Sequence, residues 1–86
     1  MRSRYEILSD MLLVSREKKT KSSILYGANL SYFQVQEYCR LLLDKHLLCL
    51  IEVDGCARYK TTEKGDKFLD CFQKIQDFLR TDQNKK

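Results

Sequence analysis

The side chains that could carry chemistry are few and scattered in this chain of 86 residues. It has one histidine, His46, and four cysteines separated by 10, 7 and 15 residues: Cys39, Cys49, Cys56 and Cys71. Zinc sites usually take their ligands from close cysteine pairs, which are missing here. We therefore expect no metal and no cofactor, and four free thiols buried in apolar runs. A redox role for Cys56, near a predicted hairpin tip, is the less favoured alternative.

Catalytic groupings are also missing. No nucleophile lies next to a base in the sequence, and the three glycines form no phosphate-binding loop. His46 has no nearby acid–base or metal partner and is expected to end a helix. The sequence therefore predicts a protein that is not an enzyme and has no small-molecule substrate.

Basic side chains are more numerous than acidic ones. The chain has 16 Lys and Arg against 12 Asp and Glu, a net charge of +4, which permits a nucleic-acid partner without requiring one. Four basic residues cluster before and at the start of a short predicted helix: Arg16, Lys18, Lys19 and Lys21. The free N–H groups and the dipole at a helix start favour anions, so this cluster suits a phosphate group. An ordinary solvated loop is the alternative.

Three helices are predicted ahead of any strand. Residues 4–14 follow the capping box Ser3–Glu6, residues 21–26 follow the N-cap Thr20, and residues 32–45 follow the capping box Ser31–Gln34. The third helix is amphipathic, with its apolar face at Val35, Tyr38, Cys39 and Leu42. Its opposite face carries Phe33, Gln36, Glu37, Arg40 and Asp44.

Two β-rich runs, residues 47–53 and 56–61, flank Asp54–Gly55 and predict a hairpin with a two-residue turn. That turn sets Cys49 opposite Lys60 and Val53 opposite Cys56, so a disulfide across the hairpin is disfavoured. One face, expected to meet the core, carries Leu48, Leu50 and Tyr59. Arg58 and Lys60 then lie on the other face.

A last helix of residues 63–80 is predicted after the N-cap Thr62, followed by a polar tail of residues 81–86. Its apolar residues are too many for one small domain to cover. Phe68 and Leu69 are expected on the core, whereas a second chain is expected to cover Phe72, Ile75, Phe78 and Leu79. The alternative is that this helix folds back along the first helix and closes the monomer.

Three helices, a hairpin and a helix, in that order, form a winged helix-turn-helix, an α+β and mostly α fold. The sequence also resembles a small archaeal winged-helix family of predicted transcriptional regulators and chromatin-type DNA-binding proteins. The resemblance extends over nearly the whole chain. Its stretches are residues 4–8 (RYEIL), 20–26 (TKxxILY), 28–32 (ANLSY), 38–42 (YCRLL), 47–48 (LL) and 59–65 (YKTTEKG).

The resemblance implies that the third helix enters the DNA major groove and that the last helix pairs with its twin as an antiparallel coiled coil. We therefore predict a homodimer that binds double-stranded DNA and regulates transcription. The winged domain would span residues 1–66 and the dimerisation helix residues 67–80. Contacts to phosphates are expected from Lys18, Lys19, Lys21 and Ser31, with Arg58 auxiliary, and groove contacts from Tyr32, Gln36 and Arg40.

The alternative function is a winged-helix adaptor that binds another protein through the exposed face of the third helix. Phe33 and Glu37 place an apolar and a negative side chain on that face, and Glu52 and Asp54 make the hairpin tip acidic. No signal peptide is predicted, and no run of about 18 apolar residues predicts a membrane span. A cytoplasmic, nucleoid-associated protein is therefore expected.

Overall fold

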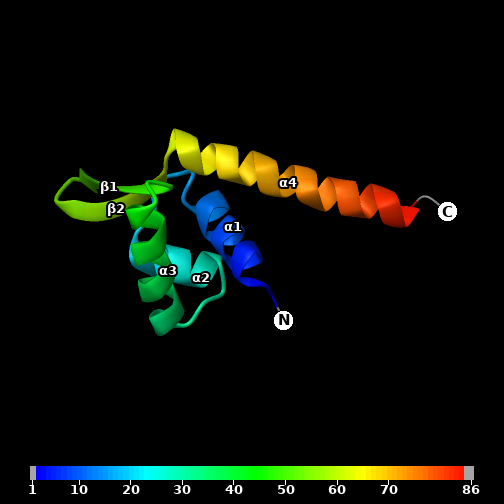
Figure 1. Cartoon of the computed structure of the whole chain (residues 1–86). Coiled ribbons are helices and arrows are strands. Elements are labelled where there is room, and N and C mark those ends of the chain that lie inside the picture. Colours follow the sequence, from blue (N-terminus) through cyan, green and yellow to red (C-terminus); the bar gives the residue numbers. More distant parts are fainter. Residues whose placement is uncertain (1, 85–86) are drawn as a thin grey trace.

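The computed structural model describes residues 2–84, with side chains for residues 2–80, and its elements follow the predicted order (Figure 1). The helices are α1 (Arg4–Val14), α2 (Lys21–Gly27), α3 (Tyr32–Asp44) and α4 (Glu63–Asn84), and the strands are β1 (Leu48–Val53) and β2 (Cys56–Thr61). The predicted α+β, mostly α winged helix-turn-helix is confirmed.

The first three helices begin at the predicted caps. In α1 the Ser3 hydroxyl accepts from the Glu6 N–H at 3.1 Å, and the Glu6 carboxylate accepts from the Ser3 N–H at 2.8 Å. Ser31 and Gln34 form the same reciprocal pair at the start of α3, and Thr20 caps α2. His46, with a φ of 63°, reverses the chain after α3 as predicted.

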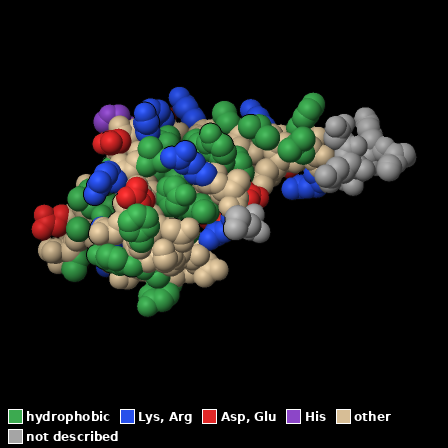
Figure 2. All heavy atoms as spheres, turned by 60° about the horizontal axis from the view of Figure 1, so that its bottom comes forward, with side chains coloured by type: hydrophobic (Ala, Val, Ile, Leu, Met, Phe, Trp, Pro, Cys, Tyr) green, Lys and Arg blue, Asp and Glu red, His purple; other side chains and the backbone are tan. Residues whose placement is uncertain are grey.

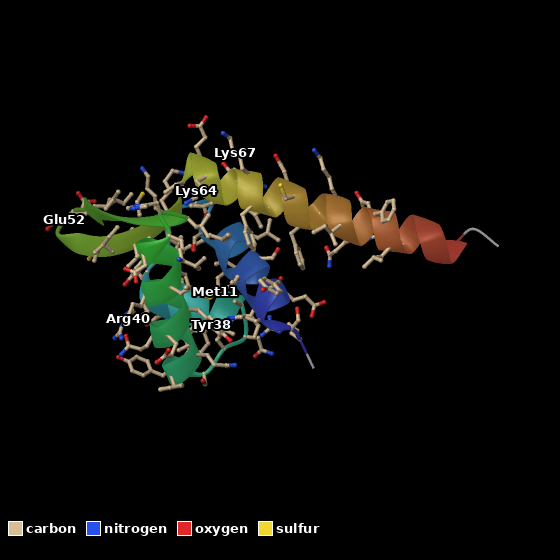
Figure 3. The ribbon with its side chains drawn as sticks, in the orientation of Figure 1. Met11, Tyr38, Arg40, Glu52, Lys64 and Lys67 are labelled. Atoms are coloured by element: carbon tan, nitrogen blue, oxygen red, sulfur yellow. The ribbon has the colours of Figure 1, made fainter. Side chains whose placement is uncertain are left out.

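The core lies where α1, α2 and α3 converge, and the base of the hairpin and the start of α4 close it. Met11 lies between the helices at its centre (Figure 3). The other side chains that are almost completely inaccessible to solvent are Leu12, Ile24, Val35, Leu42 and Leu48. Apart from Leu48 in β1, these residues are apolar positions of the predicted helices, so local periodicity located most of the core.

The hairpin has the predicted register, with Val53 opposite Cys56, Ile51 opposite Arg58 and Cys49 opposite Lys60. Asp54 and Gly55 both have positive φ, 52° and 78°, as a two-residue turn of this hand requires. The loop before α2 adds a short bridge to the outer edge of β2. There the N–H and carbonyl groups of Lys19 and Tyr59 exchange hydrogen bonds of 3.0 and 2.7 Å.

The prediction that Leu50 faces the core is wrong, because 54% of this side chain is exposed. Its strand neighbour Leu48 is buried, and so is Thr61 opposite Leu48. The hairpin extends away from the helices (Figure 1), so only its base reaches the core. Alternation along a strand identifies a face but not the length of it that another element covers.

The cysteines are free, as predicted, but their predicted burial holds only in part. Cys39 is buried in the core and Cys49 is half-buried, whereas Cys56 and Cys71 are exposed. Cys56 lies at the hairpin tip and Cys71 on the projecting helix α4, where little of the domain is near enough to cover them. The prediction that Cys56 and Cys71 are buried, which was based on their apolar neighbours in the sequence, is therefore wrong.

Helix α4 is longer than predicted and is anchored only at its start. It continues to Asn84, so residues 81–84 of the predicted polar tail are helical, and residues 85–86 lie outside the described part of the chain. Thr62 caps it by accepting from the Gly65 N–H at 3.0 Å, and the Thr62 hydroxyl donates to the His46 carbonyl at 2.6 Å. Beyond α1, the second half of the helix extends away from the other elements (Figure 1).

Candidate nucleic-acid interface

The outer face of α3 is exposed, as the helical periodicity predicts. Gln36, Glu37, Arg40 and Asp44 are exposed, and so is 71% of Phe33. Figure 3 shows Arg40 on the side of α3 away from α1, and Tyr38 on the side that faces the other helices. This face is therefore open to a partner along the length of the helix.

The two sides of this face differ in chemistry. On the side nearer the start of α2, a shallow hollow is lined by Lys21, Gln36, Arg40, Asp44 and Tyr59, among others. Across this hollow the Lys21 ammonium donates to the side-chain oxygen of Gln36 at 2.7 Å. The structure therefore brings three of the predicted DNA-binding side chains, Lys21, Gln36 and Arg40, into one place.

The other side of the face is apolar and acidic. Phe33 and Glu37 line a second hollow there, together with Gln34, Tyr38 and Arg4 of α1. Glu37, which the sequence places awkwardly for a DNA-binding helix, thus belongs to a different hollow from Gln36 and Arg40, and it has a basic residue in that hollow. This separation reduces its repulsion of a phosphate backbone that approaches from the side of Lys21.

Some basic residues of the segment before α2 make contacts within the chain, and others are exposed. Arg16 forms an ion pair with Asp66 of α4, with 3.0 Å between Nε and Oδ1. Lys19 is held by its backbone against Tyr59, while Lys18 is exposed. At the start of α3, Ser31 uses its hydroxyl as the helix cap, and 64% of Tyr32 is exposed. Lys18 and Tyr32 are thus exposed, and no hydrogen bond or ion pair engages their side chains within residues 2–80.

The wing offers little positive charge at its tip. Glu52 and Asp54 are exposed there, and Figure 3 shows Glu52 at the far end of the hairpin. Arg58 is half-buried, and its Nε is buried without a hydrogen-bond partner in the described part of the chain. The Lys60 ammonium donates to the Arg16 carbonyl at 2.9 Å. Of the two basic wing residues, Lys60 therefore serves to fasten β2 to the loop before α2.

An unfilled apolar surface runs along α4. Exposed fractions are 57% for Ile75, 73% for Phe78 and 55% for Leu79, whereas Phe72 is half-buried. Near α1 this surface becomes a groove lined by Tyr5, Phe68, Cys71, Phe72 and Ile75. Figure 2 shows apolar side chains continuing from the helical body onto this helix.

Three residues of this groove were not predicted as interface candidates: Phe68, Cys71 and, from a different helix, Tyr5. Tyr5 belongs to α1. It precedes the apolar stripe of α1 and is 59% exposed. The signal was its aromatic type at the first turn of a helix whose neighbours at Ile7 and Leu8 are buried. Only the packing of α1 against α4 brings it beside Phe72.

Among the described side chains, those of residues 2–80, no three His, Cys, Asp or Glu groups are close enough to hold a metal ion. No helix within residues 2–84 is long and apolar enough to cross a membrane.

Comparisons with known proteins agree with this geometry. A family model described as winged helix-turn-helix matches residues 1–80. Sso10a-2, a DNA-binding protein from Sulfolobus solfataricus, is 28% identical over 98% of this chain and 92% of its own, with a TM-score of 0.79. No curated protein sequence matches the chain.

Two regulators share the fold at lower identity. MepR, a transcription regulator of the Staphylococcus aureus multidrug efflux pump MepA, is 17% identical, with a TM-score of 0.75 over 92% of this chain and 61% of its own. BldR, a transcriptional regulator from Sulfolobus solfataricus, is 14% identical, with a TM-score of 0.72 over 95% of this chain and 62% of its own. Element order, caps, hairpin register and family model agree, and the chain belongs to the winged helix-turn-helix family.

Proposed function

We propose that this protein binds double-stranded DNA as a homodimer and regulates transcription. The observation that carries the proposal is the exposed pair Gln36 and Arg40 on the outer face of α3, beside Lys21. An α-helix fits the major groove, where Arg donates two hydrogen bonds to guanine and Gln ordinarily pairs with adenine. Their position midway along an exposed helix suits this kind of contact.

The relatives support the same conclusion. Sso10a-2 is described as a DNA-binding protein, and MepR has been crystallised with DNA. Both present a winged helix-turn-helix, and the likeness to Sso10a-2 extends over nearly the full length of both chains.

The proposed DNA contacts fall into two groups, contacts to phosphates and contacts to bases in the groove. Lys18, Lys19 and Ser31 are proposed to contact phosphates that flank the groove, and Tyr32, Gln36 and Arg40 to lie in it. Arg58 is a minor contact, because it is half-buried and the wing tip beyond it is acidic. Lys21, which the sequence assigned to a phosphate, is left out of the phosphate contacts, because its ammonium already contacts Gln36.

Dimerisation is proposed through α4, with residues 1–66 as the DNA-binding unit. Ile75, Phe78 and Leu79 present a contiguous apolar surface that nothing within residues 2–80 of the same chain covers, and the groove by Tyr5 extends it. A second α4 running antiparallel would bury both surfaces at once. A helix of 22 residues is about 33 Å long, close to the ~34 Å between successive major-groove half-sites.

The test is a fluorescence-anisotropy titration of a random-sequence duplex at low and at moderate salt, with light scattering on the same sample. The proposal expects a particle of twice the chain mass, with affinity falling steeply as salt rises because phosphate contacts release counterions. Failure to bind at low salt contradicts the DNA proposal. A particle of single-chain mass contradicts the dimer.

A protein-binding adaptor is the second candidate, and the exposed Phe33 beside Glu37 favours it. The two candidates respond to different substitutions. For DNA, Arg40→Ala weakens binding and Phe33→Ala has the smaller effect, whereas for a protein partner Phe33→Ala does the damage and salt matters little. In the duplex anisotropy assay, a larger loss for Arg40→Ala than for Phe33→Ala supports DNA as the ligand, whereas no duplex binding by the wild-type chain favours the adaptor.

A further inference from the structure

One hydrogen bond links the start of α2 to the middle of α3. The Lys21 ammonium lies 2.7 Å from the side-chain oxygen of Gln36. An ammonium can only donate, so it must face the carbonyl oxygen of this amide and not its NH₂ group. Lys21 therefore fixes the orientation of the Gln36 amide, with the oxygen toward α2 and the NH₂ group pointing elsewhere.

The Lys21 side chain lies against α3, among side chains of that helix. Lys21 is half-buried and lines one hollow with Gln36, Cys39 and Arg40. Burial raises the pKa of the Cys39 thiol, and the positive charge of Lys21 opposes that rise, as expected for an ammonium lying over α3. Lys18, in contrast, is exposed on the loop before α2.

The fixed orientation changes what Gln36 offers to a base. A glutamine that pairs with adenine uses both ends of its amide: the NH₂ donates to N7, and the oxygen accepts from the N6 amino group. Here Lys21 already occupies the oxygen and draws charge from it, which weakens it as an acceptor and strengthens the NH₂ as a donor. In the major groove guanine presents two acceptors, N7 and O6, and no donor.

We propose that Lys21 is a specificity-determining residue: it turns Gln36 into a hydrogen-bond donor, so that Gln36 prefers guanine to adenine. This inference rests on the proposed DNA-binding function. The sequence had suggested that Lys21 contacts a phosphate. The inference instead assigns Lys21 to the positioning of Gln36. Lys21 itself need not touch a base, because it acts through Gln36.

The experiment is selection from a randomised duplex library, with sequencing of the bound fraction for the wild-type chain, Lys21→Met, Lys21→Arg and Gln36→Ala. Methionine keeps most of the length of lysine but cannot donate. We expect the wild-type chain to favour guanine at one position and Gln36→Ala to lose that preference. Lys21→Met should shift the guanine-to-adenine ratio there toward adenine by about tenfold. Arginine still donates, so Lys21→Arg should retain guanine.

Two controls isolate the mechanism. Lys18→Met removes a nearby exposed charge and should lower affinity on all sequences alike, with an unchanged base profile. The double variant Lys21→Met/Gln36→Ala should have the same profile as Gln36→Ala alone. Thermal unfolding of each variant shows whether it is folded, and Lys21→Leu, which also cannot donate, replaces Lys21→Met if that variant is not.

The outcomes distinguish failure of the Lys21 inference from failure of the proposed DNA-binding function. If the wild-type chain binds DNA but Lys21→Met keeps the guanine preference, this inference is overturned while DNA binding stands. The same holds if Lys21→Met changes the base profile as much in the Gln36→Ala background as in the wild-type chain. If Gln36→Ala leaves the whole profile unchanged, the inference is overturned as well. Absence of any duplex binding by the wild-type chain overturns both the proposed function and the inference.

Discussion

At the scale of single residues, exposure and neighbours decide what a side chain can contribute. Arg40 is exposed on the open face of α3 and shares a hollow with Gln36. Arg16, equally basic, is held by Asp66, and Lys60 by a backbone carbonyl. Basic residues that look alike in the sequence therefore differ in what they contact, and Arg40 is the arginine that we propose contacts a base.

Arg40→Ala is predicted to weaken binding to the preferred duplex by about 1–3 kcal/mol and to relax preference at one base pair. The physical reason is loss of a two-pronged donor that matches guanine O6 and N7. Anisotropy with the preferred and the mismatched duplex measures both effects. Arg80→Ala is the matched control, because this arginine pairs with Asp77 on the projecting helix α4 and should leave base preference unchanged.

Cys39 is predicted to make stability depend on alkaline pH. Burial raises the pKa of its thiol, with the charge of Lys21 opposing the rise, so the folded chain keeps its proton at a pH where the unfolded chain releases it. The contribution to the free energy of unfolding is therefore intact below the unfolded pKa of about 8.5 and declines as pH rises toward the folded pKa. Urea unfolding of the wild-type chain and Cys39→Ala at neutral pH and at about pH 10 measures it. An equal loss of stability in both proteins contradicts the prediction.

At the scale of elements, the start of α4 is where long-range packing constrains the sequence most tightly. Thr62 caps the helix and also contacts the loop after α3, and the Lys64 ammonium donates to the Lys45 carbonyl at 2.8 Å. Figure 3 shows Lys64 at this first turn. A Cβ at Gly65 would collide with the carbonyl oxygen of Leu47 and with the Thr61 side chain. Glycine is needed here for close approach of the helix to the base of the hairpin.

Gly65→Ala is predicted to destabilise the protein by about 1–3 kcal/mol, because backbone must move to admit the methyl group. In an unobstructed helix the same change would stabilise by up to about 1 kcal/mol, so the sign of the effect tests the packing. Thermal or urea unfolding measures it. Lys67→Ala, an exposed position on the next turn of α4, serves as control and should be nearly neutral. A stabilised Gly65→Ala protein would refute the close approach.

At the scale of the whole molecule, the main feature is the projecting helix α4, whose apolar side chains are exposed. The molecule measures 54 × 26 × 19 Å, and its long axis follows α4 as the helix leaves the helical body (Figure 1). A projecting helix with exposed Ile75, Phe78 and Leu79 leaves apolar area in water that burial would stabilise. In the proposed dimer, a second copy would cover this area and would set two α3 helices at a fixed separation.

Ile75→Asp combined with Phe78→Asp is predicted to convert the dimer into a monomer, because two carboxylates would have to be buried in an apolar seam. Light scattering should then give the single-chain mass, and duplex affinity should fall because two binding units no longer act together. The wild-type thermal midpoint should rise with protein concentration, and that of the variant should not. Asp70→Lys, a charge reversal on the opposite side of α4, should leave the mass at two chains.

The sequence by itself determined the features that depend on near neighbours along the chain. The helix starts follow from Ser3, Thr20 and Ser31, the hairpin register follows from Asp54–Gly55, and the core stripes follow from helical periodicity. Each depends on interactions within a few residues, so a local pattern suffices to predict it. The exposed face of α3 was predictable for the same reason.

Only the tertiary structure decided how those elements meet. The contact between Lys21 and Gln36 joins residues 15 apart, and the ion pair between Arg16 and Asp66 joins residues 50 apart. Exposure of Leu50 and the groove at Tyr5 likewise depend on where the hairpin and α4 extend past the helical body. Periodicity says which face of an element is apolar, but coverage of that face depends on the distances between elements, which no local pattern contains.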